Sequence, residues 1–581
     1  DYNREQDLDE FSLVTLRDRY FWKDETHAQE SFARASVFAA TYNNVTDFAL
    51  AQRLYDYSSK FWFMFSTPIL SNGGTSRGLP ISCFLNYVPD SRQGLSDHYE
   101  NIWLASMGGG IGGYWGDVRS NGVATKHGSK STGSIPFMHV VDSQMMAFNQ
   151  GVTRRGSYAA YMDISHPEIE EFIIMRKESG GDLHRKCLNL HNGVNITNEF
   201  LKAVKNDEEW RLIDPKTKQP VKIVNARHLW WQIIDARAET GEPYMINIDT
   251  CNENLPQSLK DLGLEIKQSN LCSEIVLPTN EERTAVCCLS SVNLATYDEW
   301  KDNELFIQDL ITMLDNVIEH FIDHVVATTE FGEYNLNYRR FKNYVKEGKM
   351  GLHKAAYSAY RERSLGLGAM GFHSYLQQQG VNFEGLQATG INYQIFKKIN
   401  KKAKSASKKL CEVRGAYPDS SDNVYRNAHL LAIAPNASSS IICGNTSPSI
   451  EPVRANVYTH KTLSGSFQVK NKNLQKLFDD KKITKKEQDK LWKQIFSDNG
   501  SVKNLKILSK EENEINQIWI IEHAYKRQEF ICQAQSVNLF FNLPPATELQ
   551  EVHDDYLQYV HDVHWYAMHK LKSLYYFRSN A

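Results

Sequence analysis

The chain has 581 residues, and its 66 lysines and arginines nearly balance its 69 aspartates and glutamates, leaving a formal net charge of −3. This balance gives no support to a role in binding nucleic acid or a membrane surface through net charge. No apolar stretch reaches the ~20 residues of a membrane span and no signal peptide is recognisable, so we expect a soluble, intracellular protein.

Helical patterns with aromatic-rich apolar faces fill residues 1 to about 65 and predict a helical layer ahead of the main fold. From residue 66 to about 156, glycine, serine and threonine dominate and indicate loops around short strands. MGGGIGG contains a G-x-G-x-x-G at Gly108, Gly110 and Gly113, but no convincing βαβ unit surrounds it and no G-K-[ST] follows. We therefore expect neither a Rossmann site nor a P-loop here.

The stretch SNLCSEIVLPTN, residues 269 to 280, places Asn270, Cys272 and Glu274 at alternate positions of an otherwise apolar run. Residues two apart on a helix point in different directions, whereas in an extended segment they share one face, about 6.7 Å apart. We therefore predict an extended segment with an amide, a thiol and a carboxylate on one side. That side could hold one small molecule.

The later part of the chain contains one clear amphipathic helix and one charged segment. Apolar residues recur at helical spacing from Ile307 to Val325. Between about residues 469 and 514, many lysines alternate with acidic residues, which favours a solvated helical hairpin over an anion-binding patch. Because strand-like runs alternate with helices across the middle of the chain, an α/β fold is expected, although the strand order is not readable.

Two hydroxyl-rich stretches are compatible with more than one role. Ser438 to Ser440 open an apolar segment in APNASSSIICGN, where hydroxyls and backbone N–H groups can bind a phosphate or simply cap a helix. FSTPILSNGG, with Ser66 and Thr67, leaves the same two alternatives open. The adjacent Tyr575 and Tyr576 are by themselves typical of strand or core packing.

Nine cysteines are scattered through the chain without a C-x-x-C pair. This argues against a secreted disulfide framework, a zinc ribbon and a simple thiol oxidoreductase. Cys83, Cys272 and Cys287 lie far apart in sequence, as the pieces of one pocket on a barrel would.

The ordered set of motifs resembles the large catalytic (α) subunit of class I ribonucleotide reductase over nearly the whole chain. The motifs are STPILSNGG, SCFLNYVPDS, GGGIGGYWGDVRSNG, NLCSEIVLPT, CCLSSVNL, RSLGLGAMGF, APNASSS with SPSIEP, QAQSVNLFF and LKSLYYFRS. The resemblance implies a helical N-terminal region over residues 1–65 and a ten-stranded α/β barrel over residues 66–581, with the lysine-rich helices as an insertion. A central finger loop would carry the active-site cysteine.

The resemblance also implies the reaction, a radical reduction of ribonucleoside diphosphates to 2′-deoxyribonucleotides. Cys272 would become the thiyl radical that removes the 3′ hydrogen, Glu274 would be the general base, and Asn270 would hold the ribose hydroxyls. Cys83 and Cys287 would form the reducing pair, which requires their Cα atoms to lie within about 7 Å. Cys288 would point elsewhere in a strand.

In class I enzymes a separate β subunit holds the radical cofactor, so none, and no metal, is expected in this chain. Tyr575 and Tyr576 match the relay that delivers the radical. The nearest alternative is a class II reductase, which binds adenosylcobalamin in the same chain and lacks the tyrosine pair. An inactive nucleotide-binding paralogue is a second alternative, but such a chain would have lost a catalytic group, and all five are present.

Further residues are implied to bind nucleotides. The substrate phosphates would lie against Thr67, Ser82, Ser438, Ser439 and Ser440. A deoxynucleotide or ATP effector would lie at a homodimer interface, against Asp90, Arg119, Arg154 and Arg155.

Other expectations concern partners, location and chain ends. Thioredoxin or glutaredoxin would restore the dithiol in the cytoplasm of a bacterium or of a phage-infected host, with no role for nucleic acid or membranes. Little chain precedes the helical layer, so we expect no N-terminal ATP-cone. The cysteine-bearing tail that re-reduces the pair in the family is missing after Ala581, and we expect truncation or disorder at this end as the reason, not true loss.

Overall fold

The N-terminal part of the computed structural model is mainly helical. The structure describes residues 1–102, 109–125, 128–147, 157–327, 351–462, 465–502, 504–505, 515–541 and 549–579. Its first elements are η1 (Tyr2–Asp7), α1 (Glu10–Arg19), α2 (Ala28–Ala39), β1 (Thr41–Tyr42), β2 (Val45–Thr46) and α3 (Phe48–Ser59). Asp9 and Asp47 accept backbone N–H bonds at the starts of α1 and α3, both at 2.9 Å. The predicted helical layer is confirmed, with the short β1–β2 hairpin as an addition that the sequence did not indicate.

Five parallel strands form one half of the central sheet. They are β4 (Cys83–Tyr87), β5 (Gly110–Tyr114), β6 (Ser157–Asp163), β7 (His191–Ile196) and β10 (Tyr244–Asn247). Antiparallel strands border them, β11 (Ala285–Cys287) beside β4 and β17 (Ser573–Leu574) beside β10. These strands make up a seven-stranded sheet, whose middle strands are almost fully buried, as parallel strands covered on both faces usually are.

The second half of the sheet closes the barrel. β12 (Leu289–Asn293) follows β11 directly and pairs with β13 (Gly366–Met370) and with β3 (Phe63–Phe65). Beyond β13, Leu367 pairs with Leu431 and Ile433 pairs with Gln535. The Tyr575 N–H then bonds to the Val537 carbonyl at 2.9 Å, which brings the ladder back to β17. The extended segments 431–433 and 533–537 thus close the ladder. With β11 and β12 counted as one continuous segment, and with β3 outside the closed ladder, the barrel has ten segments, and the predicted ten-stranded barrel is confirmed.

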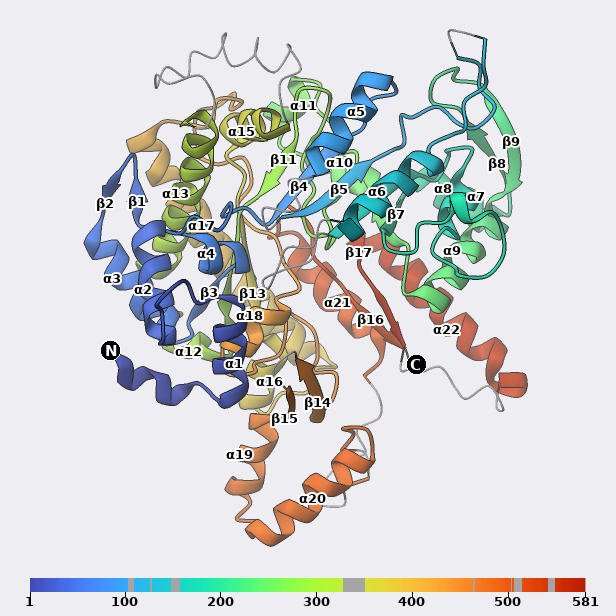
Figure 1. The fold of residues 1–581 in the computed structure, drawn as a ribbon. Coiled ribbons are helices and arrows are strands. Elements are labelled where there is room, and N and C mark those ends of the chain that lie inside the picture. Colours follow the sequence, from blue (N-terminus) through green and yellow to red (C-terminus); the bar gives the residue numbers. More distant parts are fainter. Residues whose placement is uncertain are drawn as a thin grey trace.

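Helices surround this barrel (Figure 1). The first half carries α4 (Thr67–Asn72), α5 (Arg92–Asn101), α6 (Ile135–Ala147), α7 (Ile169–Ile173), η3 (Leu183–Arg185), α8 (Asn198–Asn206), β8 (Glu209–Ile213), β9 (Pro220–Asn225), α9 (Ala226–Thr240), α10 (Ile248–Glu253) and α11 (Gln257–Asp261). The second half carries η4 (Leu294–Thr296), α12 (Tyr297–Trp300), α13 (Phe306–Ala327), α15 (Gly351–Glu362), α16 (Phe372–Gln378), α17 (Leu386–Arg414), α18 (Ala437–Ile442), α21 (Gln517–Gln528), β16 (Leu539–Phe541), α22 (Leu549–Lys570) and β18 (Phe577–Ser579). The predicted amphipathic helix is α13, whose apolar face packs against α15 and α17.

The lysine-rich segment forms two helices, α19 (Lys472–Asp480) and α20 (Lys485–Ser497), after the hairpin of β14 (Val457–Thr462) and β15 (Gly465–Lys470). It projects away from the barrel at the bottom of Figure 1. A small apolar cluster of its own, including Phe478, Trp492 and Ile495, holds these helices together, while most of their lysines face solvent.

A buried ion network ties the outer helices to the second half of the barrel. Asp315 on α13 accepts bonds from Arg363 at 2.8 Å and Arg414 at 2.7 Å, and Arg426 lies 3.4 Å away. Burial alone would raise the pKa of Asp315, but the three guanidinium groups hold that pKa well below its ordinary value. The network's contribution to stability is therefore present above the unfolded-state pKa of an aspartate, about 3.9, and is lost only as the pH falls towards the lower folded-state value.

The loop between α11 and β11, residues 262–284, enters the barrel and is called the finger loop below. Its residues contact both halves: Leu271 packs on Gly110 of β5, the Tyr161 hydroxyl of β6 donates to the Asn270 carbonyl, and the Ala534 N–H donates to the Glu274 carbonyl. The predicted central finger loop that carries Cys272 is thus observed. The described end of MGGGIGG accordingly contributes the start of strand β5, and Gly110 and Gly112 make room for this loop.

Gly112 is the tightest point of this packing. A Cβ atom at Gly112 would overlap the Ser269 carbonyl oxygen and lie 3.0 Å from the Asn270 Cα atom. We expect Gly112→Ala to lower the free energy of unfolding by about 1–3 kcal/mol or more and to displace the finger loop.

Gly390 in α17 supplies the matched control. A Cβ atom added there would meet no atom of the described residues within 4 Å outside its own helix turn. Gly390→Ala should therefore leave stability unchanged or raise it by up to about 1 kcal/mol. Thermal and denaturant unfolding of both variants, compared with the parent protein, tests this, and equal effects at the two glycines would contradict it.

Candidate active site

The tip of the finger loop is a tight turn over Asn270 to Ser273. Ser273 has a φ of 63°, and the Asn270 side-chain oxygen accepts the backbone N–H groups of Glu274 and Ile275, both at 3.1 Å. The prediction of a continuous extended segment is therefore wrong at this point. The Asn270 amide satisfies two backbone donors locally and so stabilises a turn in place of a strand.

Asn270 joins the tip to the first sulfur. Its side-chain amide nitrogen donates to the Cys83 thiol at 3.2 Å, and the Tyr161 hydroxyl donates to the Asn270 backbone carbonyl at 2.5 Å. Asn270 and Tyr161 are both completely buried. The amide is thus fixed by its oxygen on one side and by its nitrogen on the other.

Cys83 and Cys287 occupy facing positions on adjacent strands. The antiparallel pairing of β4 with β11 sets Cys83 opposite Cys287, and the two thiols share a hydrogen bond. Facing residues in antiparallel pairs have Cα atoms about 4.5 to 5.5 Å apart, within the range that a disulfide spans. Both residues are almost inaccessible, at 2% and 1% exposed. Burial, reinforced by Cys83, raises the pKa of the Cys287 thiol well above its ordinary value, so the thiol stays protonated at neutral pH.

The neighbouring Cys288 points the other way. Its thiol contacts the Leu314 carbonyl at 3.6 Å and lies in the outer core, whereas Cys287 lies with Cys83 in the barrel interior. Strand alternation accounts for this difference.

Glu274 and Cys272 share one partner from the opposite half of the barrel. The Ser536 hydroxyl contacts the Cys272 carbonyl at 2.5 Å and the Glu274 carboxylate at 3.1 Å. Glu274 is 1% exposed, so its carboxylate is held inside the barrel and not in solvent. One serine therefore fixes the distance between the thiol-bearing residue and the carboxylate.

Two tyrosines lead away from Cys272. The Tyr575 hydroxyl shares a hydrogen bond with the Cys272 thiol, and the rings of Tyr575 and Tyr576 lie 4.2 Å apart between centroids. Tyr244 of β10 packs against both, at 4.8 and 5.2 Å. Burial raises the pKa of Tyr575 well above its ordinary value, while burial and the Glu242 charge raise the pKa of Tyr576 to about 12. Both phenols are therefore protonated at neutral pH.

The hydroxyl-bearing segments meet near the end of α1. The Tyr20 hydroxyl bonds to Thr67 at 3.0 Å, and the next residue back, Arg19, bonds to the Ser438 hydroxyl at 3.3 Å. Both α4 and α18 begin here, so two helix N-termini and a guanidinium lie side by side. The first helical residues of α18 include Ser438, Ser439 and Ser440, and its N-cap is Asn436. Such an arrangement can bind an anion.

Ser82 lies next to this region, immediately before Cys83 in β4. The hydroxyls of Ser82 and Ser66 are buried and have no hydrogen-bond partner among the described residues. β3 pairs with β12, and Phe65 faces Ser290 in this pairing. Ser66 directly follows Phe65, and Ser290 is three residues from Cys287 in the chain, so Ser66 lies near the thiol pair. Both hydroxyls are thus available to a bound molecule near the thiol pair.

The residues assigned to an effector lie elsewhere. Arg119 forms an ion pair with Asp90, with Nε 3.0 Å from both carboxylate oxygens, at the carboxyl ends of β4 and β5. Arg154 and Arg155 lie outside the described residues.

Several site residues were not identified from the sequence. Tyr161 and Ser536 position the finger tip, and Tyr244, His191 and Glu242 surround the tyrosine pair. Ser536 lies in QAQSVNLFF, one of the motifs that carry the family resemblance, which was the available signal. The other four are single residues on strands or before them, and only the strand order brings them to the site.

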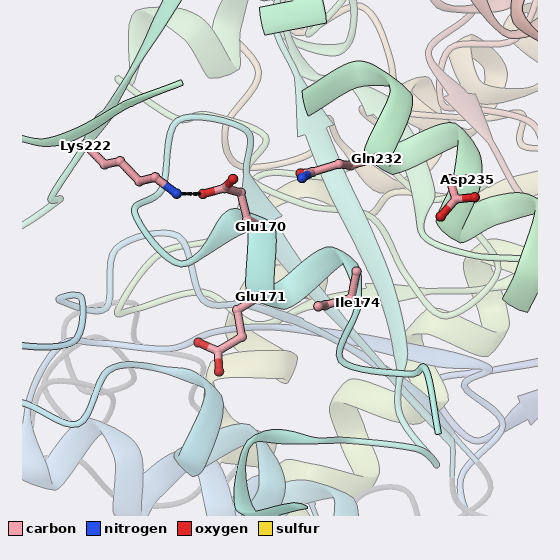
Figure 2. Close-up of a pocket in the computed structure, with 6 residues that line it drawn as sticks. All are labelled: Glu170, Glu171, Ile174, Lys222, Gln232 and Asp235. Atoms are coloured by element: carbon pink, nitrogen blue, oxygen red, sulfur yellow. Dashed lines mark hydrogen bonds and ion pairs between the residues drawn. The ribbon is translucent and has the colours of Figure 1, made fainter. Parts of the chain in front are cut away.

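A hollow on the surface of the described structure is separate from the predicted site residues. The surface hollow in Figure 2 is lined by residues of α7, β9 and α9, including Glu170, Lys222 and Gln232, and none of the predicted site residues lines it. The described residues contain no group of three or more His, Cys, Asp or Glu side chains placed to hold a metal ion. Within them, every helix is too short or too polar to cross a bilayer.

Comparisons with known proteins agree with this geometry. The family model described as "Ribonucleotide reductase, barrel domain" matches residues 81–425 and 419–577, and the model described as "Ribonucleotide reductase, all-alpha domain" matches residues 6–78. The ribonucleoside-diphosphate reductase large subunit of Invertebrate iridescent virus 3 is 42% identical, over 100% of this chain and 95% of the relative. The putative large subunit of Frog virus 3 is 45% identical, over 87% and 85%.

A solved structure is also similar over almost its whole length. The class Id ribonucleotide reductase α subunit of Actinobacillus ureae matches with a TM-score of 0.79 and 32% identity, covering 99% of this chain and 98% of the other.

The strand pairing predicts which cysteines can form a disulfide. We expect a mild thiol oxidant to remove two titratable thiols by linking Cys83 to Cys287, because these two face each other across β4 and β11. Cys287→Ser should abolish this disulfide, whereas Cys288→Ser should leave it intact, since Cys288 faces the outer core. Peptide mapping by mass spectrometry without reduction identifies the pair, and a disulfide that involves Cys288 would contradict the assignment.

Proposed function

The chain belongs to the ribonucleotide reductase large-subunit family, and we propose that the residues described above carry out its reduction of ribonucleoside diphosphates to 2′-deoxyribonucleotides. The single observation that carries this assignment is that the finger tip, which holds Cys272, reaches both the facing thiols of Cys83 and Cys287 and the tyrosine pair. Cys83 and Cys287 face each other, Asn270 links Cys83 to the finger tip, and Tyr575 contacts Cys272.

The radical enters through the tyrosines. A class I β subunit is the partner, and it supplies a one-electron oxidant from its own cofactor. In this chain Tyr576, then Tyr575, then Cys272 each loses one electron and one proton. Tyr575 restores Tyr576, and Cys272 restores Tyr575. Ring separations of 4.2 Å and a direct Tyr575–Cys272 contact support transfer by short steps inside the protein.

The chemistry on the sugar uses four further side chains. The Cys272 thiyl radical takes the hydrogen atom from C3′, and Glu274 accepts the proton of the 3′-hydroxyl. The 2′-oxygen leaves as water after taking one proton from the thiol pair. The pair also supplies two electrons and its second proton, which give C2′ its new hydrogen, and it becomes a disulfide. Cys272 then returns a hydrogen atom to C3′, and Glu274 returns its proton to the 3′-oxygen. Asn270 holds the ribose hydroxyls in reacting geometry.

The electrostatic properties of the thiol pair suit this role. A thiol must be protonated to act as the acid for a leaving hydroxide, and burial keeps Cys287 protonated at neutral pH. Cys272 at the finger tip is only half-buried, so a bound nucleotide would have to cover it before its radical, which reacts with small solutes, is formed. Closure of the site is thus part of the mechanism.

The substrate phosphates bind where α4 and α18 begin, against Thr67, Ser82 and Ser438 to Ser440. The bonds from Tyr20 and Arg19 to this region, together with the unpartnered Ser82 hydroxyl, support a site built for an anion. Arg19 adds a positive charge that the sequence did not point to. The diphosphate would therefore anchor the nucleotide with its ribose over the three sulfur atoms.

Membership of the family also suggests how the enzyme is regulated and how its thiol pair is reduced again. A deoxynucleotide or ATP effector binds near Asp90 and Arg119 at the interface of a homodimer, and the family relationship alone adds Arg154 and Arg155 as effector contacts. Thioredoxin or glutaredoxin restores the dithiol, and the protein acts in the cytoplasm, where all nine cysteines can remain reduced.

Radical transfer through the tyrosines predicts a clear separation of binding from turnover. Cys272→Ser, Tyr575→Phe and Tyr576→Phe should abolish deoxynucleotide formation with a β subunit, because none of the three replacements can carry the radical onwards. Substrate binding should not change. Cys411→Ser and Tyr393→Phe, both away from the site, are matched controls. Product formation by Cys272→Ser, or activity of the parent chain with adenosylcobalamin in place of a β subunit, would count against the class I assignment.

The general base has a measurable share of the rate. Glu274→Gln keeps the shape and the bond from Ser536 but cannot take up a proton, so we expect kcat to fall by about 10²- to 10⁴-fold with KM nearly unchanged. Steady-state assays at saturating substrate test this. A variant with normal kcat would assign the proton to another acceptor.

A further inference from the structure

One short segment, residues 534–539, contacts both the finger loop and the tyrosine pair. On the finger side, the Ser536 hydroxyl contacts the Cys272 carbonyl at 2.5 Å. On the tyrosine side, the Val537 carbonyl accepts the Tyr575 N–H at 2.9 Å. This segment therefore spans the space between the thiol and the residue that delivers the radical to it.

The backbone of the tyrosine pair has two N–H groups and two carbonyls, and all four are bonded. The backbone of residues 534–539 bonds one of each, since the Leu539 N–H also donates to the Tyr576 carbonyl at 3.0 Å. Side chains bond the other two. Nη1 of Arg237 donates to the Tyr575 carbonyl at 3.1 Å, and Oδ1 of Asn538 accepts the Tyr576 N–H at 3.3 Å.

A buried carboxyl group fixes the orientation of the Asn538 carboxamide. Nδ2 of Asn538 donates to Oε1 of Glu451 at 2.6 Å, and the Asn538 backbone N–H donates to the same oxygen at 3.1 Å. Because this oxygen only accepts, it selects the orientation in which Nδ2 faces Glu451 and Oδ1 faces Tyr576. The opposite orientation would set an NH₂ group against the Tyr576 N–H and one oxygen against another.

Glu451 is held in the protein interior for this contact. It lies in the loop after α18, and both Glu451 and Asn538 are 4% exposed. Burial raises the pKa of Glu451 to about 7, against the lowering effect of the two Asn538 bonds and of the Arg578 and Arg527 charges. When the group is protonated, the proton can reside on Oε2 and leave Oε1 as an acceptor, so the amide keeps its orientation in both forms.

We propose that Asn538, oriented by Glu451, is a positioning residue for radical transfer from Tyr576 through Tyr575 to Cys272. This rests on the proposed function, since it requires that these residues pass the radical. Asn538 exchanges no electron or proton itself. It ties the outer tyrosine to the segment that also bonds the inner tyrosine and the finger tip, and so keeps the two rings 4.2 Å apart and Tyr575 in contact with the Cys272 thiol.

Asn538→Leu is the direct test, because it removes the amide at nearly constant volume. With the full chain, a β subunit and a ribonucleoside diphosphate, we expect kcat to fall by about 10²-fold, the cost of a misplacement of about 1 Å. KM and nucleotide binding should stay at the parent values, since Asn538 contacts no substrate group. Asn316→Leu is the matched control, because Asn316 is a buried asparagine on the outer helix α13 that donates to the Ala39 carbonyl at 2.9 Å. It should keep the parent kcat.

A substrate with deuterium at C3′ locates the slow step. In Asn538→Leu, slow delivery of the radical precedes removal of the 3′ hydrogen, so the isotope effect on kcat should vanish. Glu274→Gln, whose slow step lies in the sugar chemistry, should retain it. A purely structural defect that distorts the whole site would slow the sugar chemistry as well and would leave the isotope effect in place.

Two variants of Glu451 supply an independent readout. Glu451→Gln keeps an oxygen that can accept both Asn538 bonds, whereas Glu451→Met removes it. The glutamine variant should therefore lose much less turnover than the methionine variant, and the methionine variant should lose the isotope effect as Asn538→Leu does.

The outcomes separate this inference from the proposed function. The parent kcat in Asn538→Leu overturns the positioning role, and so does a loss that raises KM or keeps the isotope effect, because either result places the defect at the sugar. If Asn538→Leu does not fold, equal turnover in the two Glu451 variants overturns it. Activity in Tyr576→Phe instead overturns the radical route itself, and the positioning role falls with it.

Discussion

The contact between the finger loop and strand β5 is the constraint on which the active site depends. The Ser269 carbonyl lies against the α-carbon of Gly112, a separation that no side chain at that position permits. From this contact the tip is extended towards Cys83 by Asn270 and towards the opposite wall by Ser536. The reacting groups therefore come from both halves of a closed sheet, and their spacing is fixed by packing and by backbone hydrogen bonds rather than by neighbours in sequence.

Much of this arrangement could be predicted from the motifs that match the family in sequence order, because the members of a family fold these motifs into the same barrel. The closed ten-segment barrel and the helical layer are examples. The choice of Cys287 over Cys288 as the inward-facing residue needs only strand alternation and agrees with the observed packing.

Local periodicity failed where a side chain competed with the backbone. The alternation of Asn270, Cys272 and Glu274 suggested a strand, but the Asn270 amide accepts two backbone N–H groups and Ser273 adopts a left-handed conformation. Likewise, the tyrosine environment could not be read from sequence, since His191 and Glu242 become neighbours only through the register of two parallel strands. The turn at the finger tip and the surroundings of the tyrosines both depend on contacts made in the folded chain, which the propensities of single residues do not encode.

The facing positions of Cys83 and Cys287 have a consequence for communication within the molecule. A bond between sulfur atoms that already face each other in an antiparallel ladder requires side-chain rotation and little backbone movement. The disulfide and dithiol forms of the protein should then have nearly the same overall shape. A reductant protein that docks on the outside would find almost no difference in shape between the two forms. Reduction of the disulfide therefore has to rely on chemical access to the two sulfur atoms and not on recognition of a conformational change.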